Sequence, residues 1–270
     1  MKKFIILIVS IFMIFSFVSC SSKENKKEEN SDKKQIKIGC TTFSEITLKL
    51  AEDEIKKLGY EVEYINFDTN ILPLKATNDE SVDASFGQHE KFVKKFNEQN
   101  KGNLAMVQPH VYTTGIGLYS EKYKKIEDIP NKAQIGIMND AMNLDRGLKI
   151  MEKSGLIKLN EKDSGTYTVL DIVENPKELK FVEMEQMQTV KSLEDLDAAL
   201  VFFTHMFNAK KDVNSYLTRD SDAKDYPMGI ITKEENKNTK WAVDIANVLR
   251  SESVQKKIND YFNGVFEFYK

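Results

Sequence analysis

The chain has 270 residues, of which 39 are Lys or Arg and 42 are Asp or Glu, so its formal net charge is −3 at pH 7. A net negative charge, with acidic and basic residues mixed, argues against a nucleic-acid partner, because proteins that bind nucleic acids usually have a strongly basic surface. The length suits one large domain or two lobes of roughly 100–150 residues each.

An export signal occupies the start of the chain. Lys2 and Lys3 precede an apolar stretch of 15 residues at 4–18, and Ser19 and Cys20 follow it. A positive start and a short apolar core are typical of a secretory signal peptide, whereas a helix that spans a bilayer needs roughly 20 apolar residues. An uncleaved N-terminal anchor is the alternative interpretation.

Residues 17–20, Phe-Val-Ser-Cys, resemble a bacterial lipobox, with Phe17 in the place where leucine is usual. The resemblance implies cleavage before Cys20 and a diacylglyceryl thioether on its sulfur. Such a lipid would hold the protein on the extracytoplasmic face of the cell membrane, more stably with two or more acyl chains than with one. Cleavage leaves 251 residues and removes Lys2 and Lys3, which takes the net charge from −3 to −5.

The segment after Cys20 is almost wholly polar and charged. Residues 21–34 cannot bury enough apolar surface to offset the entropy of ordering, so we expect a flexible tether. Its 14 residues give a reach of about 20 Å by flexible-chain scaling. With Cys20 lipidated, Cys40 has no cysteine partner, so we interpret it as a small buried hydrophobe.

In the rest of the chain, segments with the hydrophobic period of a strand alternate with segments that have the period of a helix. This alternation predicts an α/β fold with parallel-rich sheets. Predicted strands cover residues 35–39, 61–67, 103–108, 116–120, 134–138, 179–184, 198–203 and 229–232. Predicted helices cover residues 45–58, 145–154, 169–174, 189–193, 240–251 and 253–262, with a further helix around 92–96.

Five segments carry distinctive motifs. Residues 82–90 read VDASFGQHE, 111–120 contain VY and GLYS, 139–146 read NDAMNLDR, 171–183 contain DIVENP and LKFVE, and 196–199 read LDAA. Their order and spacing, across about residues 36–265, resemble the methionine-binding lipoproteins of ABC importers, the NlpA/MetQ family. A single Phe-x-Gln-His motif would be a weak signal, but the ordered set is specific.

The resemblance implies an α/β fold of the periplasmic-binding-protein type, in which two lobes joined by crossover strands close on a ligand in the cleft. The closed receptor would deliver a small-molecule ligand to an ABC permease, with an ATPase as the source of energy. No cofactor and no enzymatic activity are implied, and no Gly-rich loop followed by Lys-Ser/Thr occurs in the sequence. The expected parts are a signal peptide at 1–19, a lipidated cysteine and tether at 20–34, lobe I at 35–113 plus 229–270, and lobe II at 114–228.

The 139–146 motif supplies two candidates for polar ligand contacts. Arg146 can hold a ligand carboxylate bidentately, near a helix start where backbone N–H groups also favour anions. Asn143 can bond the polar ends of an amino acid. The alternatives are a surface ion pair of Arg146 with Asp140 or Asp145, and helix capping by Asn143.

The 82–90 and 111–120 motifs supply three further candidates. Phe86 and Tyr112 suit a thioether side chain, because sulfur packs well on aromatic rings. Ordinary core packing is the alternative for both. His89 is a candidate for the pocket wall, and its alternative role is that of a structural histidine at the start of a helix.

The chain departs from the family pattern where a ligand would be gripped. Phe202 and Thr204 lie where asparagines are common, and Met228 ends a Tyr-Pro-Met run where the family often has Tyr-Ala-Asn. The loss of an amide from a buried polar site costs about 1–3 kcal/mol. We therefore expect methionine or a related small solute, with Thr204 or His205 in place of a lost amide. A different amino acid or a short peptide is the alternative.

A zinc-binding lipoprotein is the main alternative of another class, because His89, His110 and His205 are enough to supply three zinc ligands. Their scattered positions, without a His-rich loop, argue against it. An enzyme on the same fold is a further alternative, but neither a nucleophile–base pair nor paired carboxylates stand out. A second role as a surface adhesin has no sequence signal.

Overall fold

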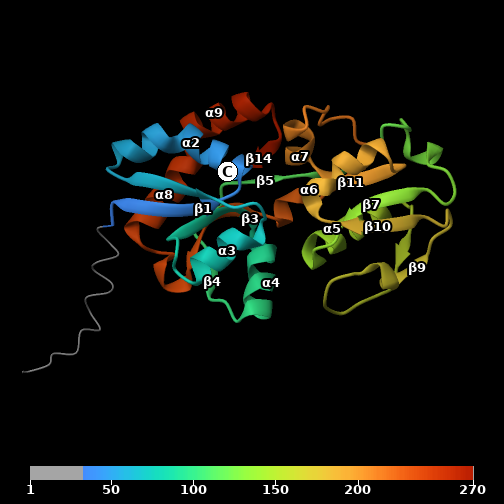
Figure 1. Ribbon diagram of the computed structural model, residues 1–270, viewed down its shortest axis with the longest axis horizontal. Coiled ribbons are helices and arrows are strands. Elements are labelled where there is room, and N and C mark those ends of the chain that lie inside the picture. Colours follow the sequence, from blue (N-terminus) through green and yellow to red (C-terminus); the bar gives the residue numbers. More distant parts are fainter. Residues whose placement is uncertain (1–32, 270) are drawn as a thin grey trace, which may run out of the picture.

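The computed structural model describes residues 33–269, so the predicted signal peptide, Cys20 and most of the predicted tether lie outside the described residues. Two β-sheets, each with helices packed against it, form two lobes side by side (Figure 1). In the described part of the chain, no helix is long and apolar enough to cross a membrane.

The first lobe is built on a seven-stranded sheet of order β14-β5-β13-β3-β1-β2, with β4 paired to β13. Strand β1 pairs in parallel with β2 and β3, whereas β13 runs antiparallel to β3, β4 and β5. The sheet is therefore mixed. Its strands are β1 (Gln35–Cys40), β2 (Glu61–Asn66), β3 (Ala84–His89), β4 (Leu104–Met106), β5 (Tyr112–Thr114), β13 (Met228–Lys233) and β14 (Phe266–Phe268).

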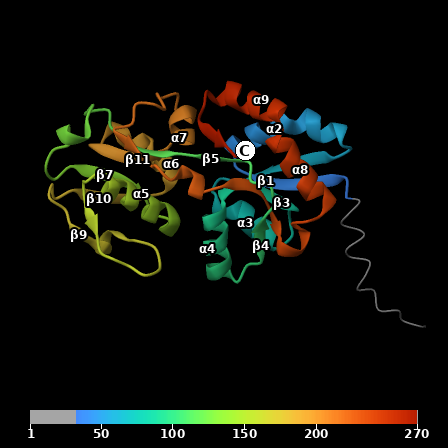
Figure 2. The same cartoon turned by 180° about the vertical axis from the view of Figure 1, so that it is seen from behind.

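Helices cover both faces of this sheet. On one face lie α2 (Thr42–Lys57), α8 (Lys240–Arg250) and α9 (Glu252–Phe262), which contact one another, and on the other lie α3 (Ile71–Asn78) and α4 (Glu90–Asn100) (Figures 1 and 2). Leu48, Ala51 and Ile55 recur at helical spacing on α2 and are fully buried. Burial of this stripe, rather than intrinsic propensity, fixes the helix on the sheet.

The second lobe is built on a five-stranded sheet of order β10-β7-β11-β6-β12. Strand β7 lies between β10 and β11 and is parallel to both, whereas β6 is antiparallel to β11 and β12. Its elements are β6 (Ile116–Tyr119), β7 (Gln134–Met138), α5 (Ala141–Lys153), β10 (Lys180–Met184), α6 (Gln186–Thr189), β11 (Ala198–Phe202), α7 (Phe203–Asn208) and β12 (Thr218–Arg219), with a small hairpin of β8 (Lys158–Leu159) and β9 (Ile172–Glu174).

Two crossover segments join the lobes. On the outward path, Gly115 alone separates β5 of the first sheet from β6 of the second, and on the return path residues 220–227 connect β12 to β13. Helices α4 and α5, which belong to different lobes, contact each other. One hydrophobic cluster runs through the junction, since it contains Tyr112 of β5 together with Tyr119 of β6 and Phe203 of α7. The two lobes are therefore joined by one nearly continuous strand pair, β5 and β6, and by the irregular segment at 220–227.

Most of the predicted elements are confirmed, and one is wrong in kind. The predicted helix at 169–174 is a 3-10 turn at Val169–Asp171 that leads into β9, which pairs with β8. Leu170 is 92% exposed, so the apolar residues of this segment do not form a buried helical stripe, and the β-branched Ile172 and Val173 favour the strand. Cys40 is fully buried, as expected, and burial raises the pKa of its thiol to about 12.

Candidate functional site

A cavity of about 230 Å³ lies between the two sheets, and both lobes line it. The first lobe contributes the segments at 41–44, 67–70 and 87–89, which follow or end strands β1, β2 and β3. The second lobe contributes residues 185–187 and part of 202–208, which follow β10 and β11. Ligands of α/β sheets bind at this position, beyond the carboxyl ends of the strands.

One wall of the cavity is aromatic and apolar. Tyr112 of β5 stacks on Phe266 of β14 with ring centroids 4.0 Å apart and an interplanar angle of 28°. The side chains of Phe43, Phe92 and Met228 extend the same wall. Such a surface suits an aliphatic, aromatic or thioether side chain of a ligand.

A polar bridge crosses from one lobe to the other at the cavity. Nδ1 of His89 accepts a hydrogen bond from the backbone N–H of Phe92 at 3.0 Å, so Nε2 carries the ring proton and donates to Oδ1 of Asn143 at 3.4 Å. Nδ2 of Asn143 in turn donates to Oδ2 of Asp140 at 3.0 Å. This chain of bonds connects the start of α4 to the start of α5.

The histidines of the cavity are electrically neutral at pH 7. Burial lowers the pKa of His89 to about 3, and the nearby charge of Arg146 acts in the same direction. Burial also lowers the pKa of His205 to about 4. The charged residues found to line the cavity are Asp68, which is exposed, and Glu185, whose carboxylate accepts a hydrogen bond from the N–H of Met187 at 2.6 Å.

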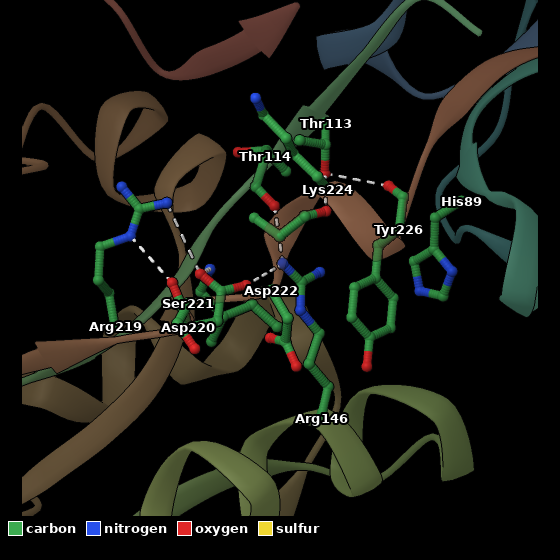
Figure 3. Close-up of polar contacts among 12 residues, drawn as sticks. His89, Thr113, Thr114, Arg146, Arg219, Asp220, Ser221, Asp222, Lys224 and Tyr226 are labelled. Carbon is green, nitrogen blue, oxygen red and sulfur yellow. Dashed lines mark hydrogen bonds and ion pairs between the residues drawn. The ribbon is translucent and has the colours of Figure 1, made fainter. Parts of the chain in front are cut away.

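Arg146 lies beside the cavity, in a buried niche where α5 meets the crossover segments (Figure 3). Its Nη2 donates to the carbonyl oxygen of Thr114 at 2.9 Å and forms an ion pair with Oδ2 of Asp220. The centre of the guanidinium lies 4.1 Å from the centroid of the Tyr226 ring and 5.7 Å from that of Phe202. The Nε and Nη1 atoms have no hydrogen-bond partner.

The surroundings of Arg146 exclude one of the two sequence-based interpretations. It is 1% exposed and pairs with Asp220, so the alternative of a surface pair with Asp140 or Asp145 is wrong. Asp140 instead caps α5, and Asp145 pairs with Lys149 at 2.7 Å. Arg146 is not among the residues found to line the cavity, and its direct contact with a ligand carboxylate stays a prediction.

Four of the other candidates reach the cavity. His89, Tyr112, Asn143 and Thr204 all line it. Phe86 is fully buried behind the wall, where its ring meets Tyr112 edge-on with centroids 5.7 Å apart. The structure thus brings together candidates from three separate motifs and Thr204 from the segment after β11, with Phe86 as a support for Tyr112.

The three histidines of the zinc alternative do not gather in one place. His89 and His205 line the cavity, but His110 lies outside it, with its Nε2 2.8 Å from the amide of Gln108 and 4.0 Å from a carboxylate oxygen of Glu90. Among residues 33–269, no group of three or more His, Cys, Asp or Glu side chains is arranged to hold a metal ion.

Sequence reasoning missed several lining residues. Phe266 enters the cavity wall only because the last strand, β14, pairs with β5 about 150 residues earlier in the chain, as the hydrogen bond from Thr114 to the carbonyl of Val265 reflects. Such a long-range pairing leaves no local pattern. Gln88, which lies beside His89 in the 82–90 motif, is a weaker candidate from the sequence, and it lines the cavity.

The sequence profile of the NlpA lipoprotein family matches residues 36–267. The chain belongs to this family. The D-methionine-binding lipoprotein MetQ of Escherichia coli O157:H7 is 30% identical over 254 residues, which is 92% of this chain and 91% of the relative.

Solved structures with the same fold include two from methionine-binding proteins. The substrate-binding protein of a methionine transporter from Streptococcus pneumoniae has a TM-score of 0.81 and 30% identity, covering 88% of this chain and 96% of that one. A nutrient-binding protein from Burkholderia cenocepacia, solved bound to methionine, has a TM-score of 0.82 and 26% identity, covering 87% and 100%. The family is therefore one of substrate-binding lipoproteins of transporters, with the mixed α/β fold described above.

Proposed function

We propose that this protein is the lipid-anchored substrate-binding protein of an ABC importer. It captures an amino acid or a close derivative, methionine or a related small solute, and delivers it to a permease that a cytoplasmic ATPase drives. Cys20 would carry the lipid, and residues 21–34 would tether the two lobes to the extracytoplasmic face of the membrane. The names of the relatives support the transport role.

The cavity between the lobes is the observation that carries the proposal. Its aromatic wall fits an apolar side chain, and its polar bridge runs from His89 of one lobe to Asn143 of the other. A ligand that contacts both walls therefore binds the closed form more tightly and shifts the population toward it. We propose His89, Tyr112, Asn143 and Thr204 as ligand contacts.

The crossover segments are the proposed hinge between lobe I, at 35–113 plus 229–270, and lobe II, at 114–228. Strand β5 continues into β6 through Gly115 alone, so a small change in the backbone there reorients the second sheet relative to the first. The permease would distinguish the closed receptor from the open one by the relative position of the two lobes.

A thermal-shift experiment tests the proposed ligand class. Protein freed of ligand by unfolding and refolding is mixed with L-methionine, D-methionine, other amino acids, their amides and short peptides. A ligand at 100 times its Kd adds about 2.7 kcal/mol of stability, which raises the Tm by roughly 5–10 °C in a protein of this size. A shift of that size with an amino acid or derivative supports the proposal.

Matched variants locate the binding site. Asn143→Leu removes the polar bridge and should abolish the ligand-induced shift, whereas Asn214→Leu changes an exposed asparagine outside the cavity and should leave the shift intact. The absence of any shift with all amino acids, amides and peptides would overturn the proposed ligand class.

A further inference from the structure

We infer that Gln88 binds the zwitterionic end of an amino acid, with its amide oxygen accepting from the ammonium group and its amide nitrogen donating to the carboxylate. The inference rests on the function proposed above, and it adds a specificity-determining residue to the site. It predicts that the receptor selects solutes with a free ammonium group and a free carboxylate on the same carbon atom.

Gln88 is a buried amide that borders the cavity without hydrogen-bond partners. It is 3% exposed and lines the cavity, yet neither its Oε1 nor its Nε2 has a partner in the described structure. Such atoms have lost their hydration without a replacement, which is costly and rare in folded proteins. The pair therefore indicates a ligand that presents a donor and an acceptor on neighbouring atoms.

The two atoms of a primary amide match the two charged groups of an amino acid. The amide offers an acceptor oxygen beside a donor nitrogen, and the α-carbon of an amino acid carries an ammonium donor beside a carboxylate acceptor. Hydrogen bonds with one charged partner are shorter and stronger than bonds between neutral groups. A zwitterion therefore leaves neither polar atom of Gln88 unpaired.

Gln88 lies on the side of the cavity where a positive charge is available. The next residue, His89, contacts Asn143 at 3.4 Å, and Asn143 precedes Arg146 by three residues on α5, which is close to one helical turn. The Nε and Nη1 atoms of Arg146 have no hydrogen-bond partner. A ligand carboxylate at this end of the cavity has the counter-ion that a buried carboxylate needs, and Gln88 adds a neutral donor.

The neighbouring lining residues leave the ammonium group few acceptors. Met228, which pairs with His89 across strands β13 and β3, and Phe202 have no polar side-chain group. The Oδ1 atom of Asn143 already accepts from His89. Among the amides of the described lining, Gln88 is the one whose oxygen and nitrogen are both buried and without a partner.

The backbone before Gln88 is fixed by close packing. Gly87 has a φ of +112°, and a Cβ atom at this position would lie 2.0 Å from Oγ of Ser44. No other residue type fits there without displacement of Ser44. Strand β3 therefore ends in close contact with the start of α2, and the backbone that carries Gln88 needs little ordering when a ligand binds.

Probes that differ only in their charged groups test the inference. Isothermal titration of the refolded protein compares L-methionine with desamino-methionine, which lacks the ammonium group, and with decarboxy-methionine, which lacks the carboxylate. We expect both analogues to bind at least tenfold more weakly than L-methionine. If another amino acid gives a larger thermal shift, that amino acid and its two corresponding analogues replace these probes.

Variants of Gln88 assign the recognition to this residue. Gln88→Leu removes both polar atoms, so it should weaken L-methionine binding at least tenfold, and each analogue, which loses one bond instead of two, by a smaller factor. Gln88→Glu keeps an acceptor but replaces the donor with a negative charge. It should weaken L-methionine at least tenfold and bind decarboxy-methionine at least as tightly as the wild type does.

A matched control changes a glutamine outside the site. Gln99→Leu alters an exposed glutamine of α4 and should leave the affinities for all probes unchanged. Circular dichroism and the Tm of the free proteins establish that each variant is folded.

The results separate the inference from the proposed function. An affinity of Gln88→Leu for L-methionine within threefold of the wild-type value overturns the inference and leaves the amino-acid receptor in place. Equal losses for all probes in Gln88→Leu, or a parallel loss of decarboxy-methionine and L-methionine in Gln88→Glu, assign a structural role to Gln88 and also overturn it. A wild-type protein that binds amides or peptides but no free amino acid overturns the inference alone. If no amino acid, amide or peptide binds, both the inference and the proposed ligand class fail.

Discussion

Arg146 and Asp220 form an ion pair in which both side chains are almost completely buried, at 1% and 0% exposure. The pair joins α5 of the second lobe to the crossover segment that leads back to the first lobe. The same guanidinium bonds to the carbonyl of Thr114 on the other crossover strand. One side chain thus links both connections between the lobes, which makes it a structural element of the proposed hinge.

Removal of one partner of this pair should destabilise the protein strongly. Asp220→Asn leaves the charge of Arg146 buried without its counter-ion, and Arg146→Met does the same to the charge of Asp220. We expect the free energy of unfolding to fall by about 3–5 kcal/mol in each variant. Urea denaturation measures the loss. The control is Glu174→Gln, which breaks the exposed pair with Lys158 and should cost at most about 1 kcal/mol.

The double variant Arg146→Met/Asp220→Asn should lose less stability than the sum of the two single variants, because neither charge then remains buried alone. Additive losses would contradict the coupling of the two residues. Amino-acid binding that persists in a folded Arg146→Met variant would support a purely structural role, whereas selective loss of amino-acid binding in a folded variant would support direct ligand contact by Arg146.

Stability should fall as the pH drops below the pKa of an unfolded histidine. His89 and His205 have folded pKa values of about 3 and 4, below the unfolded value of about 6.5. The unfolded chain therefore binds protons first, and the stabilisation present above pH 6.5 is lost as the pH falls toward the folded values. Each histidine contributes at most about 1.4 kcal/mol per pH unit.

Most carboxylates remain ionised between pH 6.5 and 5, so the histidines dominate the pH dependence of stability there, and His110, whose pKa burial also lowers, contributes alongside His89 and His205. His89→Gln and His205→Gln should each flatten the dependence of the free energy of unfolding on pH in this window. A slope that is equal in the wild type and in both variants would show that His89 and His205 do not control it.

The sequence allowed much of the fold to be predicted, and less of the site. Strand β7 at 134–138 and the helices near 240 and 253 carry clear local periodicity, and they lie where expected. The 3-10 turn and strand at 169–174 were mistaken for a helix, since a short apolar run looks alike in both forms. Its Leu170 is exposed, which only the tertiary structure reveals.

The contacts within the candidate site join residues that are distant in the sequence. The 82–90 and 139–146 motifs identified His89 and Asn143, and the structure brings them together at 3.4 Å. The partner of Arg146 could not be predicted, because Asp220 lies 74 residues away on a segment without periodic pattern. Family resemblance indicated which residues matter, but only the fold indicates which of them face the cavity.

Gly87, the single glycine among the residues found to line the cavity, should not tolerate a side chain. Gly87→Ala combines a positive φ with a contact of 2.0 Å to Oγ of Ser44, and we expect a loss of about 2–4 kcal/mol in urea denaturation. Gly59→Ala is the matched control, because its φ is +86° but the added Cβ meets nothing within 4 Å, so about 1 kcal/mol is expected. Equal losses would mean that the approach of Ser44 to β3 is unimportant.

Cys20 should determine where the protein resides. A Cys20→Ser variant lacks the sulfur that a diacylglyceryl group needs, so it should lose labelling by a radioactive or clickable fatty acid and leave the membrane fraction. Cys40→Ser, which changes the buried cysteine, is the control and should remain membrane-bound. Unchanged fractionation of Cys20→Ser would contradict the lipid anchor and favour an uncleaved N-terminal segment.

Phe202 should control which form of the ligand the cavity prefers. Phe202→Asn removes the ring that flanks Arg146 and places an amide at the cavity wall. A ligand carboxylate could then accept a hydrogen bond from this amide and approach the guanidinium of Arg146. We expect the ratio of affinities for L-methionine and L-methioninamide to shift at least tenfold toward methionine. The lost ring should lower the free energy of unfolding by up to about 3–5 kcal/mol.

Phe202→Leu separates the two effects of this substitution, because it removes the ring without an amide. Isothermal titration of both variants should give a larger shift toward methionine in Phe202→Asn than in Phe202→Leu. An unchanged ratio in Phe202→Asn would mean that the ring does not screen Arg146 from the ligand. Equal shifts in the two variants would mean that removal of the ring alone changes the ratio of affinities, because the asparagine amide would then add nothing to carboxylate binding.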